Sequence, residues 1–214
     1  ERKIQLPFET FDKLNDMHID ALREIGNIGS GNAASALSTM LCCPVNISVP
    51  TVQVLDYNDA VEQMGGPEQM IVGSLISLEG DVQGMILFLL QKNFSSMMIK
   101  TLLCAEEAPE MESIDEMGYS VIQEVANIMA ASYLNAIGSL TGLTIGMSTP
   151  SLCIDMLGAI LSVPAIYYAN ISDKIIYIQD EFSGHDFRAP SHILLIPDMD
   201  SLKNIMGKLG LEVE

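Results

Sequence analysis

A carboxylate and a carboxamide stand three residues apart in each half of the chain, as Glu24 and Asn27 and again as Glu124 and Asn127. An amide can orient a water molecule, and a carboxylate can pair with a cation. Neither is a suitable nucleophile, and no His, Cys or Lys lies on the same predicted helix face to activate one. Their oxygens alone make a poor metal site. The pair therefore suits a protein that completes another molecule's active site, as a glutamine orients attacking water in a GTPase.

Both pairs belong to an internal repeat with an offset of 100 residues. Six of 31 positions are identical between Asp20–Pro50 and its counterpart, where unrelated sequences would give roughly two. The identical pairs are Glu24/Glu124, Asn27/Asn127, Ile28/Ile128, Ala36/Ala136, Ser48/Ser148 and Pro50/Pro150. A solvated surface has no reason to keep an acid and an amide at matching positions in halves that kept little else. The repeat therefore favours a function for these residues.

Apolar residues recur at spacings of three and four in each repeat, which predicts two long helices with one face toward a core. They are Ile19, Leu22, Ile25, Gly29, Ala33, Ala36, Leu37 and Met40 in the first half, and Tyr119, Ile122, Val125, Met129, Tyr133, Ala136, Ile137 and Leu140 in the second. The segment Ser113–Glu116 suits a capping box at the start of the second helix.

The polar residues of each repeat fall on the opposite side of the same helices. With Asp20 at zero on the helical wheel, Glu24 lies at about +40° and Asn27 at about −20°, while the apolar residues centre near 200°. We call this set the polar stripe; its members are Asp20, Glu24, Asn27 and Gly31 in the first helix and Ser120, Glu124, Asn127 and Ala131 in the second. We expect both stripes to project away from the core, with the small residues leaving one end uncrowded.

After each helix the pattern changes to alternation with period two, which predicts strands. The first strands are marked by Val45, Ile47, Val49, Val52 and Val54, and by Ile145, Met147, Leu152 and Ile154. Further strands are expected at Ile71–Leu78, Val82–Leu90, Ile160–Tyr168, Ile175–Ile178 and His192–Ile196, and short helices at about Ser95–Cys104 and Ser201–Leu209. Each half thus reads as helix, strands and helix.

The predicted fold class is α/β in the α+β sense: two pseudo-symmetric halves share a mostly antiparallel or mixed sheet, with the long helices packed on it. We expect residues 1–214 to form a single domain of two repeats, about 11–104 and 113–211, joined by an acidic connector at 105–112. Two independent domains are disfavoured because halves of about 100 residues with so few aromatic side chains would make thin cores.

Composition excludes several classes of partner. Acidic residues outnumber basic ones by 28 to 10, giving a formal charge of −18, so binding to nucleic acid or to an anionic membrane surface is not expected. The uncharged stretches Ile25–Leu55 and Val125–Ile154 contain Asn, Ser, Gly and proline, which argues against membrane spans. The four cysteines form no C-x-x-C pair, which favours core packing in a reducing compartment. Without a secretory signal pattern, we expect a cytoplasmic protein.

The spacing of the polar residues resembles a known family. An Asp or Ser, followed by Glu four residues later, Asn three later and proline about twenty later, is similar to the motif of the CheC/CheX/FliY family of bacterial chemotaxis phosphatases. Here the motif stands as Asp20, Glu24, Asn27 and Pro50, and as Ser120, Glu124, Asn127 and Pro150. The run Glu24–Ala34 also resembles the family, and the resemblance extends from about Phe11 to Leu211. Two intact motifs without an appended flagellar-switch domain resemble the CheC branch most closely.

The resemblance implies a phosphatase that hydrolyses the aspartyl-phosphate of the response regulator CheY. Asn27 and Asn127 would orient the attacking water, and Glu24 and Glu124 would pair with the regulator's active-site lysine. The remaining members of the polar stripe would contribute to docking: Asp20, Gly31, Ser120 and Ala131. Mg²⁺ would belong to the regulator, so no cofactor or metal is expected on this chain. The receptor-modifying deamidase CheD is implied as a second partner.

Two other interpretations stay open. Gly29–Ala34 matches the dinucleotide-binding pattern G-x-G-x-x-A, but it follows a helical pattern where a strand is required. The stronger alternative is a non-catalytic adaptor that binds CheD or a flagellar switch component, although both Glu and both Asn are retained. His18, His185 and His192 are scattered along the chain, which favours solvated or hydrogen-bonded roles over metal binding.

Overall fold

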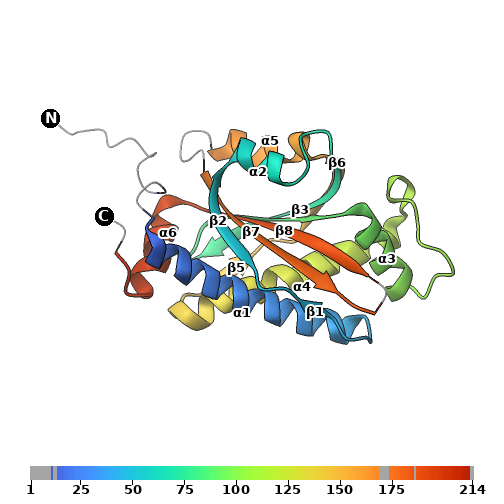
Figure 1. Ribbon diagram of the computed structural model, residues 1–214, viewed down its shortest axis with the longest axis horizontal. Coiled ribbons are helices and arrows are strands. Elements are labelled where there is room, and N and C mark those ends of the chain that lie inside the picture. The colour runs from blue at the N-terminus through green and yellow to red at the C-terminus, as the bar shows by residue number, and fades with distance from the viewer. Residues whose placement is uncertain (1–10, 12–13, 169–173, 186, 213–214) are drawn as a thin grey trace.

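The computed structural model describes residue 11 and residues 14–168, 174–185 and 187–212, and shows an eight-stranded antiparallel sheet with helices on both faces (Figure 1). The long helices α1 (Asp16–Met40) and α4 (Glu116–Thr141) lie side by side on one face, together with α3 (Lys92–Leu102) and α6 (Met199–Lys208). Helices α2 (Tyr57–Gln63) and α5 (Leu157–Tyr168) cover the other face. A 3₁₀ turn, η3 (Met111–Ser113), precedes α4. The predicted α+β class is confirmed.

The two halves exchange strands within the sheet. The strands are β1 (Asn46–Ile47), β2 (Thr51–Asp56), β3 (Met70–Gly80), β4 (Gly84–Leu90), β5 (Ile145–Met147), β6 (Ser151–Met156), β7 (Lys174–Ser183) and β8 (Arg188–Pro197). Strands β1 and β2 pair with β7 of the second half, and β5 and β6 pair with β3 of the first. The hairpins β3–β4 and β7–β8 meet at the centre through β4 and β8. The sheet is therefore pseudo-symmetric, and both halves contribute to the same cores.

The central strands are apolar on both faces because helices cover both. On β7, Ile176 and Ile178 pack in the core beneath α1 and α4, whereas Ile175 and Tyr177 pack beneath α2 and α5. This is the alternation expected of a pleated strand between two layers. The strand positions predicted from the sequence for β3, β4, β7 and β8 are confirmed, with ends that differ by a few residues.

One predicted strand is wrong. Ile160–Tyr168 belongs to helix α5, which begins earlier, at Leu157. The buried residues of α5 follow the i, i+3, i+4, i+7 spacing of a helix face and are Leu157, Ile160, Leu161 and Pro164. The predicted strand began at Ile160 and so left out Leu157, the first buried residue of the helix face. Helix α2 was not predicted, since a seven-residue helix with one buried residue, Ala60, carries almost no periodic signal.

Three local expectations are also corrected. Helix α4 begins without the predicted capping box: the carboxylate of Asp115 accepts a hydrogen bond from the backbone N–H of Gly118 at 2.9 Å. Cys42, Cys104 and Cys153 are exposed instead of core-packed. The first two of these cysteines follow the last turns of α1 and α3 with φ of 52° and 51°, in the left-handed region that ends helices. Tyr119 and Leu140, expected in the core, are exposed near the two ends of α4.

A buried polar cluster ties α1 and α4 to the sheet. The hydroxyls of Ser30 on α1 and Tyr133 on α4 both donate to Oδ2 of Asp180 on β7, at 2.6 and 2.8 Å. Burial raises the pKa of Asp180, and these hydrogen bonds partly oppose the rise. Burial, and then the nearby carboxylate, raise the pKa of Tyr133 well above its usual range. Because a buried carboxylate is costly without partners, this cluster favours one relative placement of the two long helices.

A second buried pair makes stability depend on pH. The hydroxyl of Tyr177 and Nδ1 of His192 are 2.8 Å apart, and burial lowers the pKa of His192 from 6.5 to about 4. Between these values the unfolded chain binds more protons than the folded chain, so the free energy of unfolding falls as pH falls. We expect a loss of about 2 kcal/mol on acidification to pH 5. Denaturant titrations from pH 8 to 5 measure it.

The His192→Gln variant is the control, because Asp180, whose pKa is raised, acts on stability in the opposite direction over part of this range. The difference in unfolding free energy between the wild-type protein and the variant should shrink as pH falls. A difference that is constant with pH would show that His192 titrates normally in the folded protein.

Candidate functional site

The polar stripes lie on the outer faces of α1 and α4. Asp20, Glu24 and Asn27 are exposed on α1, and Ser120 and Glu124 are exposed on α4. Asn127 is half-buried, as are the small residues Gly31 and Ala131. A Cβ added at Gly31 would meet no atom within 4 Å. Each stripe thus presents a carboxylate and an amide one helical turn apart, followed by a small residue.

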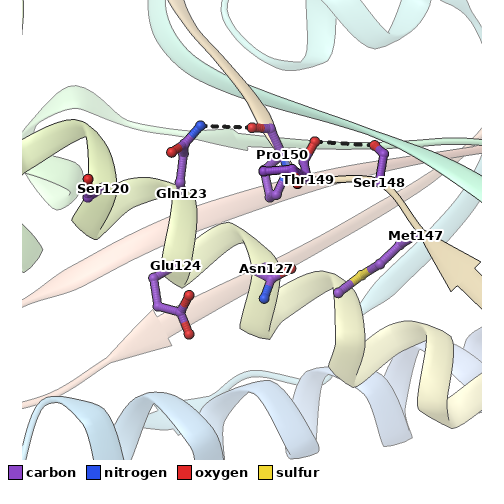
Figure 2. A pocket seen from close by; sticks show the side chains of 8 residues that line it. All are labelled: Ser120, Gln123, Glu124, Asn127, Met147, Ser148, Thr149 and Pro150. Carbon is purple, nitrogen blue, oxygen red and sulfur yellow. Dashed lines mark hydrogen bonds between the residues drawn. The ribbon is translucent and has the colours of Figure 1, made fainter. Parts of the chain in front are cut away.

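The α4 stripe borders a pocket of about 400 Å³ that opens beside Glu124 and Asn127 (Figure 2). Its lining comes from α4, from the last residue of β5 and from the linker between β5 and β6: Ser120, Gln123, Glu124, Asn127, Met147, Ser148, Thr149 and Pro150. Nε2 of Gln123 donates to the carbonyl of Pro150 at 3.0 Å, which joins the helix to the linker. The sequence predicted no site role for Gln123, Met147 or Thr149, because only the folded chain brings the linker beside α4.

Ser148 anchors this linker to β3. Its backbone N–H donates to the carbonyl of Ser77 at 2.9 Å, and its hydroxyl accepts from the N–H of Ser77 at 3.0 Å. Ser48 makes the same two contacts with the backbone of Glu181 on β7, at 3.0 and 2.9 Å. The recurrence of this serine at an offset of 100 residues therefore has a structural cause: in both halves it holds the linker that precedes Pro50 or Pro150.

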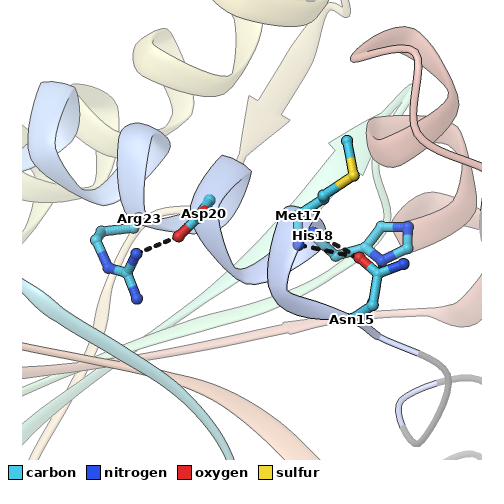
Figure 3. Close-up of polar contacts among 5 residues, drawn as sticks. All are labelled: Asn15, Met17, His18, Asp20 and Arg23. Carbon is cyan, nitrogen blue, oxygen red and sulfur yellow. Dashed lines mark hydrogen bonds and ion pairs between the residues drawn. The ribbon is translucent and has the colours of Figure 1, made fainter.

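The α1 stripe has different neighbours (Figure 3). Arg23, at the position of Gln123, forms an ion pair with Asp20 on the exposed face. Ser120, the counterpart of Asp20, instead donates to the backbone carbonyl of Glu116 at 2.9 Å. The start of α1 is fixed by Asn15, whose side chain accepts from the N–H groups of the first turn. The two stripes share an acid and an amide, but the residues beside them differ in charge: α1 carries Asp20 and Arg23 where α4 carries the uncharged Ser120 and Gln123.

The arrangement suits contact with a large molecule. Both acids and Asn27 are exposed on the helix surfaces, Asn127 is half-buried, and the pocket opens beside Glu124 and Asn127. Within the described ranges, no group of three or more His, Cys, Asp or Glu side chains is placed to hold a metal ion. The described helices include none with the length and apolar character needed to cross a membrane. Gly29–Ala34 lies within α1, not at the strand-to-helix turn that dinucleotide binding requires.

Comparison with known proteins identifies the relatives of this chain. The model of the CheC-like family matches twice, at residues 17–54 and 117–154. Both halves of this chain are therefore similar to the CheC-like family. The two matched segments contain both Glu/Asn pairs and both prolines, at the same offset of 100 residues as the repeat. The chain is also 28% identical over 204 residues to the CheY-P phosphatase CheC of Bacillus subtilis, covering 94% of this chain and 97% of the relative.

Two FliY proteins are also similar to this chain, one in sequence and one in fold. The flagellar motor switch phosphatase FliY of Bacillus subtilis is 28% identical over 139 residues, which cover 65% of this chain and 36% of the relative. The crystal structure of Thermotoga maritima FliY matches with a TM-score of 0.73 at 21% identity, covering 92% of this chain and 98% of that one. The structural match shows that this chain shares the fold of that FliY structure.

Proposed function

We propose that this protein is a phosphatase that hydrolyses the aspartyl-phosphate of phosphorylated CheY. The observation that carries the proposal is the recurrence of a Glu/Asn pair on the solvent side of α1 and α4, inside both segments that match the CheC-like family. The name of the relative CheC from Bacillus subtilis, a CheY-P phosphatase, supports the same substrate, and the name of FliY supports phosphatase activity.

In the proposed mechanism, the receiver docks with its phosphorylated aspartate against a polar stripe. The amide of Asn27 or Asn127 orients a water molecule, whose oxygen attacks phosphorus. The bond between phosphorus and the aspartyl oxygen breaks, so inorganic phosphate leaves and the carboxylate of CheY is restored. The carboxylate of Glu24 or Glu124 pairs with a lysine of CheY and so fixes the docked orientation. Mg²⁺ on CheY stabilises the charge on the phosphoryl group.

The decay of phosphorylated CheY, with and without this protein, tests the proposal. The receiver is phosphorylated with a small phosphodonor, and inorganic phosphate release is followed after the donor is removed. A catalyst accelerates decay well below stoichiometric amounts, because each molecule turns over many receivers. Unchanged decay at a concentration where CheY binds would contradict the proposed function.

That negative result would favour the adaptor role. An exposed apolar surface on α5 supports this second role. On the sheet face opposite the stripes, α5 exposes Val163, Ile166 and Tyr167, with exposed fractions of 53%, 76% and 67%. A groove of about 320 Å³ lies between α2 and α5 and is lined on the α5 side by Gly158, Leu161, Ser162 and Ala165. Exposed apolar side chains of this size mark surfaces that bind proteins. We propose this face as the place where CheD docks, away from the polar stripes.

A further inference from the structure

An exposed methionine precedes the polar stripe in both halves of the chain. Met17 on α1 and Met117 on α4 have exposed fractions of 64% and 59%. They are the only identical pair when residues 11–20 are compared with residues 111–120, and both segments that match the CheC-like family begin at this methionine. A single exposed apolar side chain needs no explanation. Two of them at matching positions, where the two halves otherwise differ, indicate a shared use.

The methionine side chain does not build the start of either helix. The N-caps are Asn15 and Asp115, whose side chains accept hydrogen bonds from backbone N–H groups of the first turn. The residues that can pack together across a helix start stand one before the N-cap and four after it. They are Leu14 and Ile19 on α1, and Ile114 and Tyr119 on α4. The methionine, two residues after the N-cap, belongs to neither set.

The methionine is in line with the polar stripe of its own helix. It precedes Glu24 or Glu124 by seven residues, which places it about 20° around the helix and about 10 Å along it from the glutamate. The asparagine of the stripe is about 15 Å along the helix from the methionine. Figure 3 shows Met17 in the first turn of α1, just before Asp20. Methionine and stripe therefore form one continuous surface with an apolar end.

A receiver docked on a stripe is large enough to cover the methionine as well. A receiver domain of about 120 residues is roughly 35 Å across, more than twice the spacing between the methionine and the asparagine. An exposed pair between a carboxylate and a lysine contributes little affinity in water, whereas covering an apolar side chain contributes more. Figure 1 shows that α1 begins near α6 and α4 near α3, so each methionine is at the outer end of its own stripe.

We propose that Met17 and Met117 anchor the receiver domain of phosphorylated CheY through an apolar contact, one methionine for each stripe. The inference rests on the proposed function and adds the residues that supply affinity for the partner. The glutamate of each stripe then sets the orientation of the receiver and the asparagine positions water. The methionine holds the receiver without touching the reacting atoms, so it acts on binding and not on the chemical step.

Steady-state kinetics of the matched variants test the inference. Met17→Gln with Met117→Gln keeps the length of both side chains and a good helix former, but removes the apolar contact. We expect the KM for phosphorylated CheY to rise about 5–20-fold while kcat stays within about twofold. Met17→Leu with Met117→Leu keeps the contact apolar and should keep both constants within about twofold. Met156→Gln, at a methionine of β6 that is 46% exposed, should change neither constant.

Binding without turnover gives a second readout. CheY loaded with Mg²⁺ and beryllofluoride, which takes the place of the phosphoryl group, is titrated into protein that carries ¹³C-labelled methionine methyl groups. The methyl signals of Met17 and Met117, assigned from the leucine variants, should shift, and that of Met156 should not.

The outcomes separate the anchor from the phosphatase function. An unchanged KM in the glutamine double variant, with unshifted methyl signals, would overturn the anchor and leave the phosphatase function standing. A fall in kcat alone would also contradict it, because a docking contact does not act on the chemical step. A wild-type protein that neither binds CheY nor accelerates its dephosphorylation would overturn the proposed function itself.

Discussion

Replacing Asn27 and Asn127 together by alanine is expected to slow hydrolysis of phosphorylated CheY by about 10²–10³-fold, as for other groups that position a reacting atom. Asn27 is exposed and Asn127 is half-buried, so neither amide is part of the buried core. Alanine removes the hydrogen bonds that orient water but keeps the helix, for which it is the best former. The phosphate-release assay measures the loss, and each single variant should keep the activity of the other site.

The chain offers matched controls for this double variant. Asn58 on α2 and Asn93 on α3 are exposed asparagines on helices that carry no polar stripe. Asn58→Ala with Asn93→Ala also removes two amide side chains from the surface and should leave the rate within about twofold of wild type. If the control pair lost as much activity as the stripe pair, the effect would come from a general loss of surface amides and not from water positioning.

Gly29→Ala is expected to be strongly destabilising, although alanine is the better helix former by about 1 kcal/mol. The added Cβ would lie 2.6, 2.9 and 3.0 Å from three ring atoms of Tyr133. That ring cannot retreat easily, because it is buried and its hydroxyl is bound to Asp180. Overpacking of this kind costs about 1–3 kcal/mol, and occasionally more. We expect the net loss of unfolding free energy, measured with urea, at the upper end of that range.

Gly31→Ala, two residues further along α1, is the matched control. Its Cβ would meet nothing within 4 Å, so the helix-forming preference acts alone and stability should rise by up to about 1 kcal/mol. The two variants should therefore differ by about 3–4 kcal/mol in opposite directions from wild type. Equal effects at the two positions would mean that the close contact between α1 and α4 is absent in solution.

The helices and stripes were predictable because their signals are local and repeated. The apolar spacing through Leu22, Ile25 and Gly29 fixes which side of α1 is buried, and so fixes where Glu24 and Asn27 point. The second repeat gave the same result independently through Ile122, Val125 and Met129. The recurrence of Ser48 and Ser148 was also visible, but its cause, two backbone hydrogen bonds to a strand, could only come from the fold.

What could not be predicted depends on contacts between distant segments. Strand β2 pairs with β7 and not with its own half, and no periodicity within either segment specifies that choice. The bond from Gln123 to Pro150 and the burial of Asp180 beneath Ser30 and Tyr133 likewise join residues far apart in sequence. Helix α5 was missed for a local reason, since its β-branched and aromatic residues, such as Val163 and Ile166, are typical of strands.

A crystal structure of this protein with CheY bound to Mg²⁺ and beryllofluoride tests the central claim most directly. The account predicts that the amide of Asn27 or Asn127 lies within hydrogen-bond distance, about 3 Å, of a water molecule at the beryllium centre. The carboxylate of the neighbouring Glu24 or Glu124 should contact a lysine of CheY. A receiver bound with its beryllofluoride group away from both stripes would contradict the account.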